Sequence, residues 1–150
     1  AMISRRIYVA SSWRNSQQGS VVIALRDAGH EVYDFKNPPH GRGGFAWSEI
    51  DPKWNSWSAQ QYRQALFTPI AQAGFRADLD GMIWADVCLL LLPCGRSAHL
   101  EAGWMAGQAG KQVIVLTRDG EEPELMALLA DSICLSFNEV LKELQRKPRV

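Results

Sequence analysis

A run of six apolar residues, VCLLLL at 87–92, constrains the fold of this chain more than any other feature. Apolar side chains at every position indicate a strand that is buried on both faces, as in the centre of a parallel sheet. A polar loop at 93–97 and a helical pattern over 98–109 follow directly. In α/β proteins, ligands bind where such strands end and loops lead into the next helix. The segment therefore predicts a parallel sheet with a candidate site at the carboxyl end of this strand.

Strand-like and helical patterns alternate along the rest of the chain. Strands are predicted at 6–10, 31–35, 87–92, 112–116 and 133–136, and helices at 17–28, 58–70, 77–84, 98–109, 121–130 and 138–146. Ser58 is the expected N-cap of the helix over 58–70, and Gly74 is expected to break the helical pattern. This alternation predicts an α/β fold, namely a doubly wound, flavodoxin-like or Rossmann-like parallel sheet of about five strands with helices on both faces. We expect a single domain over residues 1–150, because no linker or repeat divides the chain.

The charge of the chain is balanced, with 16 Lys and Arg against 16 Asp and Glu. Nucleic acids and anionic membranes attract an excess of positive charge, so we expect neither as a partner. The longest apolar run is too short to span a bilayer, and no signal-peptide pattern is present. Three cysteines without a CxxC pair disfavour a disulfide framework and favour a cytoplasmic location. We expect no metal and no cofactor, because no ligand spacing supports either.

Glu101 is the acid expected at the predicted site, in the first turn of the helix over 98–109. Ser97 can cap that helix and, four residues before Glu101, projects from about the same face. With Gly95 and Arg96, the N–H groups at the start of the helix favour an anion. An acid in a first turn can also serve the helix alone, so the pattern leaves both interpretations open.

The loop after the first predicted strand is the second candidate wall of the site. Ser11, Ser12, Trp13 and Arg14 follow that strand and emerge at the same sheet edge as the Glu101 loop. Hydroxyls and a guanidinium suit a phosphate or the hydroxyls of a sugar. The alternative is an ordinary solvated loop.

A series of three carboxylates precedes the apolar run. Asp78 and Asp80 are two residues apart on a predicted helix, so only one of them is expected to enter the site. Asp86, directly before the strand, is interpreted as a structural acid in a turn. Cys94 and His99 form a thiol and imidazole pair without a third member, so a nucleophilic cysteine is not expected.

The segment 36–57 is unusually long for a connection in a compact domain, which indicates a functional lid or disorder. It carries Phe45, Trp47, Trp54 and Trp57 in or beside it. Aromatic side chains of this kind can stack on a nucleobase. They can equally fix the loop onto the core, and the sequence leaves both interpretations open.

The assembled motifs resemble those of the nucleoside 2-deoxyribosyltransferase superfamily, which includes deoxynucleoside 5′-monophosphate N-glycosidases. The three motifs are IYVASSWR at 7–14, ADLD at 77–80 leading into AD at 85–86, and SAHLEAG at 97–103 running to GK at 110–111. The chain departs from many relatives at Ser11, where they have Gly, and in the spacing from Ser97 to Glu101. The pattern PxGxSxxxE at 93–101 is also similar to a loop of the phosphoribohydrolases called lysine-decarboxylase-like proteins.

The resemblance implies roles for individual residues. Glu101 would be the nucleophile or ion-pair partner at the anomeric carbon, Asp78 would handle the proton of the base, and Tyr8 would position Glu101. The implied substrate-binding residues are Ser11, Ser12, Trp13, Arg14, Gly95, Arg96, Ser97, His99 and Asp80, with Arg14 at a 5′-phosphate. Many members form dimers or larger homo-oligomers in which a neighbour's C-terminal segment completes the pocket, so the resemblance implies a homodimer or higher homo-oligomer here.

The expected function is therefore cleavage of an N-glycosidic bond in a nucleoside or nucleotide by a carboxylate nucleophile. Transfer to a second base or hydrolysis by water would both follow from this chemistry. Two alternatives stay open from the sequence: a non-catalytic nucleotide sensor on the same fold, and an NAD glycohydrolase of the TIR-like kind.

Overall fold

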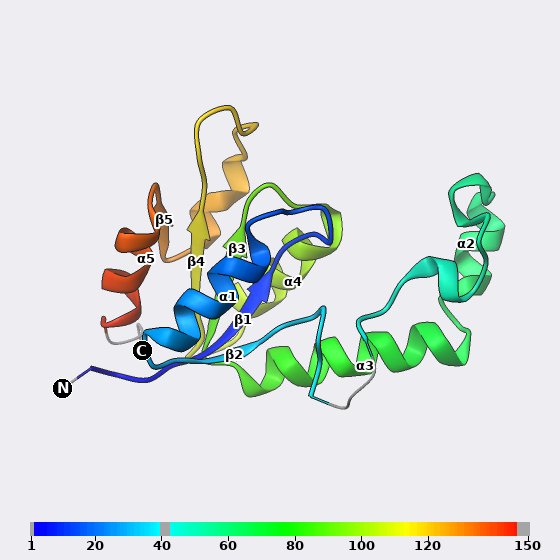
Figure 1. Cartoon of the computed structure of the whole chain (residues 1–150). Helices are drawn as coiled ribbons and strands as arrows, with labels where there is room; N and C mark the ends of the chain where they lie inside the picture. Colours follow the sequence, from blue (N-terminus) through cyan, green and yellow to red (C-terminus); the bar gives the residue numbers. More distant parts are fainter. Residues whose placement is uncertain (1, 40–42, 147–150) are drawn as a thin grey trace.

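The computed structural model describes residues 2–39 and 43–146, and its strands form one parallel sheet (Figure 1). The strands are β1 Arg6–Ala10, β2 Glu31–Tyr33, β3 Val87–Leu91, β4 Gln112–Leu116 and β5 Ser132–Cys134. They lie in the order β2-β1-β3-β4-β5, and every neighbouring pair is parallel. This order confirms the predicted flavodoxin-like sheet. All of β3 is buried, as its unbroken apolar run predicts.

Helices cover both faces of the sheet, as predicted from the alternating pattern. The α-helices are α1 Gln18–Asp27, α2 Ala59–Ala65, α3 Pro69–Trp84, α4 Arg96–Ala106 and α5 Phe137–Leu144. On one face, α1 and α5 pack on Ile7, Leu89 and Ile114; on the other, α3 and α4 pack on Tyr8, Cys88 and Val113. Successive strand residues point to opposite faces, so the tyrosine of β1 faces α3 and α4.

Helix α3 is longer than predicted and extends well beyond the sheet (Figure 1). The helix is continuous through Gly74, so the predicted break at that residue is wrong. The break lies earlier, where Thr68 caps the new helix and Pro69 occupies its first turn. A Cβ at position 74 would lie 2.8 Å from the Cβ of Phe45, so Gly74 allows close approach of the preceding loop. Ser58 caps α2 as predicted, through a hydrogen bond accepted from the backbone of Gln61.

The described part of the long aromatic segment, residues 43–57, packs along α2 and α3. It contains the short 3-10 helices Trp47–Glu49 and Trp54–Ser56. Trp47 makes edge-to-face contacts with Phe45, Trp57 and Tyr62, at ring-centroid distances of 4.8, 5.7 and 6.0 Å. These rings therefore fix the segment to the projecting helices rather than to the sheet.

Two predicted helices differ in the structure. Residues 121–130 contain only the 3-10 helix Leu125–Leu129, whose leucines are largely exposed. A helix in a protein depends on burying an apolar face, and this segment has no such packing. Helix α4 begins at Arg96 with Gly95 as its N-cap, so Ser97 is not the cap. None of the described helices has the length and apolar character needed to cross a membrane.

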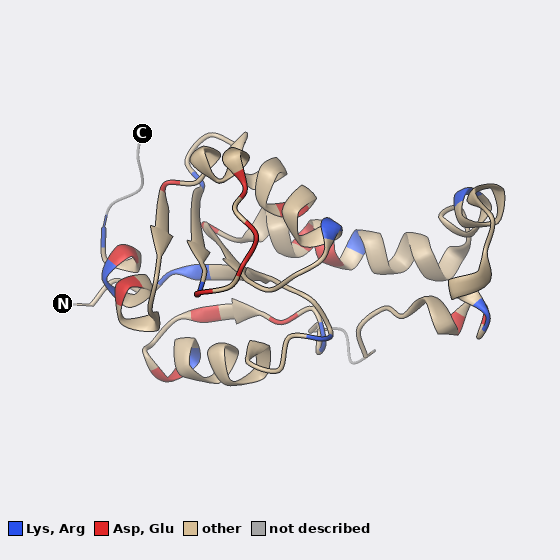
Figure 2. Ribbon diagram, turned by 90° about the horizontal axis from the view of Figure 1, so that it is seen from above, with Lys and Arg blue, Asp and Glu red and all other residues tan. Residues whose placement is uncertain are grey.

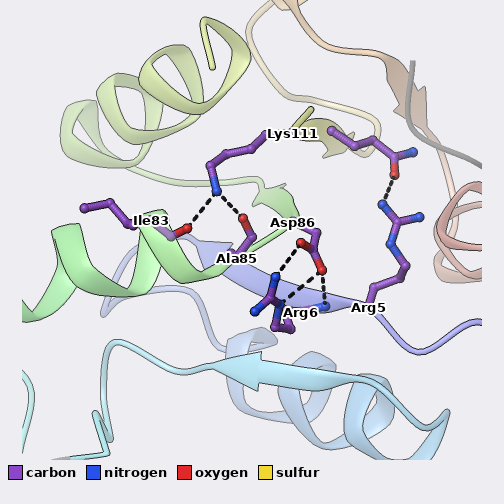
Figure 3. Close-up of polar contacts among 7 residues, drawn as sticks. Arg5, Arg6, Ile83, Ala85, Asp86 and Lys111 are labelled. Atoms are coloured by element: carbon purple, nitrogen blue, oxygen red, sulfur yellow. Dashed lines mark hydrogen bonds and ion pairs between the residues drawn. The ribbon is translucent and has the colours of Figure 1, made fainter. Parts of the chain in front are cut away.

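The amino-terminal edge of the sheet is held by charged side chains (Figure 3). Arg6 and Asp86 form an ion pair at 3.0 Å, which confirms Asp86 as a structural acid. Lys111 donates hydrogen bonds to the carbonyls of Ile83 and Ala85, at the end of α3. These contacts tie the end of α3 to the turns before β3 and β4, and so fix the orientation of the helix that carries Asp78.

Candidate active site

The carboxyl ends of β1 and β3 meet at the point where the strand order reverses. Such switch points are where ligands bind in open α/β sheets. The loops that follow the two strands are joined directly: Ser11 Oγ donates to the Leu91 carbonyl at 2.9 Å, and Asn15 Nδ2 donates to the Pro93 carbonyl at 3.1 Å. The sequence predicted that these loops share an edge, and the structure confirms it.

Glu101 and Tyr8 meet at this edge. The Tyr8 hydroxyl donates a hydrogen bond to Glu101 Oε2. Tyr8 is 1% exposed in the middle of β1, so its ring has a fixed position. Glu101 lies in the second turn of α4, because the helix starts at Arg96; its predicted place in the first turn is wrong. The acid therefore does not serve the helix N-terminus, and its contact with Tyr8 is a tertiary one.

Asp78 and Tyr33 form a second pair beside the first. The Tyr33 hydroxyl donates to Asp78 Oδ1 at 2.9 Å. Helix α3 comes close enough because of Gly81, where a Cβ would lie only 2.8 Å from the Tyr33 ring. Tyr33 was not among the residues predicted for the site. The sequence indicates that this tyrosine lies in a strand. The register that places it opposite Tyr8 is set only when the sheet assembles.

The two tyrosine rings stack on each other and join the two pairs. Their centroids are 5.2 Å apart and their planes differ by 7°. Because the rings are paired in register on neighbouring strands, both hydroxyls point toward the α3 and α4 side of the sheet. The result is a row of Glu101, Tyr8, Tyr33 and Asp78 contributed by four different elements.

Both carboxyls of this row hold their protons more tightly than usual. Burial raises the pKa of Glu101 to about 7; the hydrogen bond from Tyr8 opposes the rise and the charge of Asp78 adds to it. Burial also raises the pKa of Asp78, against the hydrogen bond from Tyr33. Within the described residues, neither carboxylate has an ion-pair partner. Buried acids without cations are suited to exchanging protons near neutral pH.

A small cavity of about 170 Å³ opens beside Asp78. Its apolar walls are Phe35 and Phe45 on one side and Ile70, Ala73 and Ala77 of α3 on the other. Aromatic walls together with the carboxyls of Asp78 and Glu49 in the lining suit a planar heterocycle with a polar edge.

The predicted residues of the first loop are spread around the site. The Ser11 hydroxyl is engaged by the Leu91 carbonyl, and Ser12 Oγ accepts a hydrogen bond from the backbone of Arg14 at 3.2 Å. Trp13 is half exposed, meets Phe35 edge to face and lies under the Lys36 ammonium, 5.5 Å from its ring centroid. Arg14 is exposed, so its guanidinium is open to a ligand.

Other predicted residues lie away from the carboxyl row. Asp80 is exposed and pairs with Arg76 at 3.8 Å, so of the two aspartates only Asp78 reaches the tyrosines. Gly95, Arg96 and His99 line a separate groove on the far side of α4, and Ser97 is exposed. His99 Nδ1 lies 3.0 Å from the Gly95 carbonyl and 3.6 Å from Cys94 Sγ. Burial raises the pKa of Cys94 to about 11, which does not favour a thiolate nucleophile.

Comparisons with known proteins give the fold. No protein-family model matches the chain, and no curated protein matches its sequence. Among solved structures, a 2-deoxyribosyltransferase from Bacillus psychrosaccharolyticus is similar, with a TM-score of 0.57, 23% identity, and 96% of this chain and 98% of that chain covered. A CMP N-glycosidase from Clostridium botulinum gives a TM-score of 0.49 at 18% identity, covering 93% of this chain and 98% of that one. The resemblance expected from the sequence is thus confirmed as a likeness of fold: over nearly its full length, this chain is folded like a 2-deoxyribosyltransferase.

Proposed function

We propose that the chain belongs functionally with the nucleoside 2-deoxyribosyltransferases and cleaves the N-glycosidic bond of a nucleoside or nucleotide. The observation that supports this most is the row of two partly buried carboxyls, each hydrogen-bonded by one of two stacked tyrosines, at the sheet's switch point. Glycosidic cleavage with a covalent intermediate needs two carboxyl groups with different protonation states. The similar fold of a 2-deoxyribosyltransferase supports the same conclusion.

Glu101 is the proposed nucleophile. Its ionised carboxylate attacks the anomeric carbon, a bond from a carboxylate oxygen to that carbon forms, and the bond from carbon to base nitrogen breaks. Tyr8 holds Oε2, which leaves the other oxygen for the attack. Because the pKa of Glu101 is about 7, its reactive form becomes abundant as pH rises through neutrality.

Asp78 is the proposed acid. The electron pair of the broken bond stays on the base, which takes a proton from the Asp78 carboxyl. The raised pKa of Asp78 favours its protonated form, and the cavity beside it would receive the base. We propose that Tyr33 positions this carboxyl through the bond to Oδ1. In the second step, water or a second base attacks the anomeric carbon, and the bond from that carbon to the Glu101 oxygen breaks and frees the carboxylate. The attacking group gives its proton to the Asp78 carboxylate.

The sugar's 5′ side is proposed to face the first loop. Ser12 is partly exposed and Arg14 is exposed there, and Arg14 is suited to a 5′-phosphate. Ser11 is instead proposed to hold the two loops together, since its hydroxyl is already bonded. The first turn of α4, which begins at Arg96, would add N–H groups to the anion site.

The test is chromatographic measurement of free base released from a panel of nucleosides and their 5′-monophosphates, with and without an acceptor base. We expect base release that Glu101→Gln abolishes while circular dichroism shows an unchanged fold. Arg14→Ala, as a matched variant, should impair monophosphates about 10- to 100-fold more than nucleosides. Intact-protein mass spectrometry with a slow 2-fluoro nucleoside should show the sugar bound to the wild type only. Tight nucleotide binding in calorimetry without base release would indicate a sensor, and nicotinamide release from NAD alone would indicate a glycohydrolase of that class.

A further inference from the structure

We propose that the candidate site selects a nucleobase with an exocyclic amino group, and that Glu49 is the residue that recognises this group. The preferred bases are then cytosine and adenine, rather than uracil and hypoxanthine, which carry an oxo group in its place. The inference rests on the proposed function, because it takes the cavity beside Asp78 as the place of the base. It adds a specificity-determining residue that lies outside the sequence motifs of the site.

Among the described residues that line this cavity, only Asp78 and Glu49 have polar side chains. Asp78 lies on α3, and Glu49 is the last residue of the 3-10 helix Trp47–Glu49. Figure 2 shows acidic residues both on α3 and on the segment that runs beside it, outside the sheet. A base in this cavity therefore meets apolar walls and two carboxyl groups from different elements.

One oxygen of Glu49 is engaged by the protein and the other can accept a hydrogen bond from a ligand. Oε2 accepts a hydrogen bond from the Ala46 backbone N–H at 2.9 Å, which holds the carboxylate in one orientation. The side chain is exposed, and within the described residues no cation pairs with it. A carboxylate offers acceptors and no donor, so Oε1 requires a donor on the ligand.

The short helix that carries Glu49 has a fixed position relative to Asp78. Trp47 packs edge to face on Phe45 and on Trp57, at ring-centroid distances of 4.8 and 5.7 Å. Phe45 in turn lies against Gly74 of α3, four residues before Asp78. The same packing thus places an aromatic wall and an acceptor beside the helix that carries the proposed acid. Groups held by packed elements discriminate between ligands more precisely than groups on free loops.

Asp78 and Glu49 make different demands on the base. Asp78 is the proposed proton donor, so the base must present an acceptor, such as a ring nitrogen, toward it. Glu49 accepts, so the base must present a donor toward it. An exocyclic amino group supplies such a donor, as when Glu or Asp accepts from cytosine N4 in DNA recognition. An oxo group at that position would put two acceptors together and leave both without a donor.

Binding of free bases tests the inference without any turnover. Ligand-observed NMR titrations give the Kd of two pairs, cytosine with uracil and adenine with hypoxanthine. Within each pair, an amino group is replaced by an oxo group. We expect the amino-bearing base to bind to the wild type about tenfold or more tightly. The same preference should appear in the rates of base release from the corresponding 2′-deoxynucleosides.

Glu49→Gln is the variant that tests the assigned residue. The Ala46 N–H needs an acceptor, so the amide oxygen should take the place of Oε2 and the amide NH₂ that of Oε1. The site then presents a donor, so the preference should fall to equality or reverse toward uracil and hypoxanthine. Glu139→Gln is the matched control, because exposed Glu139 also accepts a backbone N–H, from Leu135, and lies on α5 away from the cavity. It should keep the wild-type ratios.

The outcomes separate this inference from the proposed function. Equal binding within both pairs, no binding of any of the four bases, or a preference that Glu49→Gln leaves unchanged overturns the inference. Base release at equal rates from amino and oxo substrates overturns it as well, while the proposed function stands. If the proposed function is wrong, no nucleoside releases its base, and the amino preference and its response to Glu49→Gln are still measured in the binding titrations.

Discussion

Carboxyl groups at the two edges of the sheet, where the parallel strands begin and end, have pKa values shifted in opposite directions. At the carboxyl edge, Glu101 and Asp78 are partly buried and accept hydrogen bonds from tyrosine hydroxyls, and loss of solvent raises the pKa of each. At the amino edge, Asp86 is partly exposed and lies against the Arg6 guanidinium, whose hydrogen bond lowers the pKa of that acid. A carboxylate with a cation is fixed in its ionised form, whereas one with only a hydroxyl partner keeps a proton available near neutral pH.

The contrast separates structural acids from candidate chemical ones. The Arg6–Asp86 pair joins the start of β1 to the turn before β3, and Lys111 caps the end of α3 nearby. These contacts orient the elements without needing to change protonation. Of the two tyrosine-bound acids, Asp78 lines the cavity beside α3, where a ligand has access. Substitutions of the acids at the two edges should therefore have effects that differ both in the property affected and in size.

The largest expected effect is that of Glu101→Gln on base release. The amide keeps the size of the side chain but cannot attack the anomeric carbon, so the rate should fall about 10³-fold or more. Asp86→Asn at the opposite edge is the matched control and should change the rate less than about threefold. Stopped-time chromatography of the released base measures both. Equal losses in the two variants would remove the proposed distinction between the edges.

Asp78→Asn should have the next largest effect. An amide cannot donate a proton to the leaving base as an acid does, and general acid catalysis contributes about 10²- to 10⁴-fold. The loss should be smaller for a substrate whose base leaves without protonation, such as a nitrophenyl glycoside, than for a natural nucleoside. A variant that loses both activities equally would contradict the assignment of Asp78 as the acid.

The stability of the fold should depend on pH with opposite signs at the two edges. The folded-state pKa of Glu101 is raised, so its contribution is full below about pH 4.5 and is lost as pH rises through about 7. Glu101→Gln should therefore match the wild type near pH 4 and be more stable near pH 8, by at most about 3 kcal/mol.

Asp86 provides the reverse case for the same measurement. Its folded-state pKa is lowered, so its contribution is present at neutral pH and is lost as pH falls through the folded value. The pair is solvent-exposed, so Asp86→Asn should lower the free energy of unfolding by less than about 1 kcal/mol. The decrease is expected only at pH values above the folded-state pKa of Asp86. Thermal unfolding from pH 3 to 8 follows both variants, and curves of the same slope would be inconsistent with the electrostatics of the two edges.

The smallest expected effect on activity is that of Tyr33→Phe. The lost hydrogen bond to Asp78 is worth about 0.5–1.5 kcal/mol, so base release should slow up to about tenfold. That bond lowers the pKa of Asp78, so its removal raises the pKa further and moves the alkaline limb of the pH profile to higher pH. Tyr62→Phe, in α2, is the control for loss of a hydroxyl. A slower rate with an unshifted profile would assign Tyr33 a structural role alone.

Much of the fold follows from local patterns in the sequence. The apolar run of β3, the alternation of strands and helices and the cap at Ser58 all predicted elements that the structure contains. The helix break at Gly74 and the helix over 121–130 were wrong. In both places the outcome depends on a distant partner, since Phe45 packs on Gly74 and no surface buries the leucines of 125–129.

Some residues of the candidate site could likewise be predicted from the sequence, and others could not. Tyr8, Asp78 and Glu101 could be named from their motifs, and the structure brings all three to one edge. Gly95, Arg96 and His99 face another groove, because the start of α4 at Arg96 sets which residues of the helix turn toward β1. Tyr33 could not be named, because the register of parallel strands joined through a helix leaves no local pattern in sequence.

The sequence by itself determined which segments become buried strands and which acids lie at strand ends, because burial and turn chemistry are recorded residue by residue. Only the tertiary structure decided which acids are shielded from solvent and which form an ion pair with an arginine. Glu101 and Asp86 are both acids beside the same strand, and their environments differ because α4 and α3 close over one edge while arginine side chains reach the other. The pKa of a carboxyl depends on that enclosure, and enclosure exists only once the elements have packed.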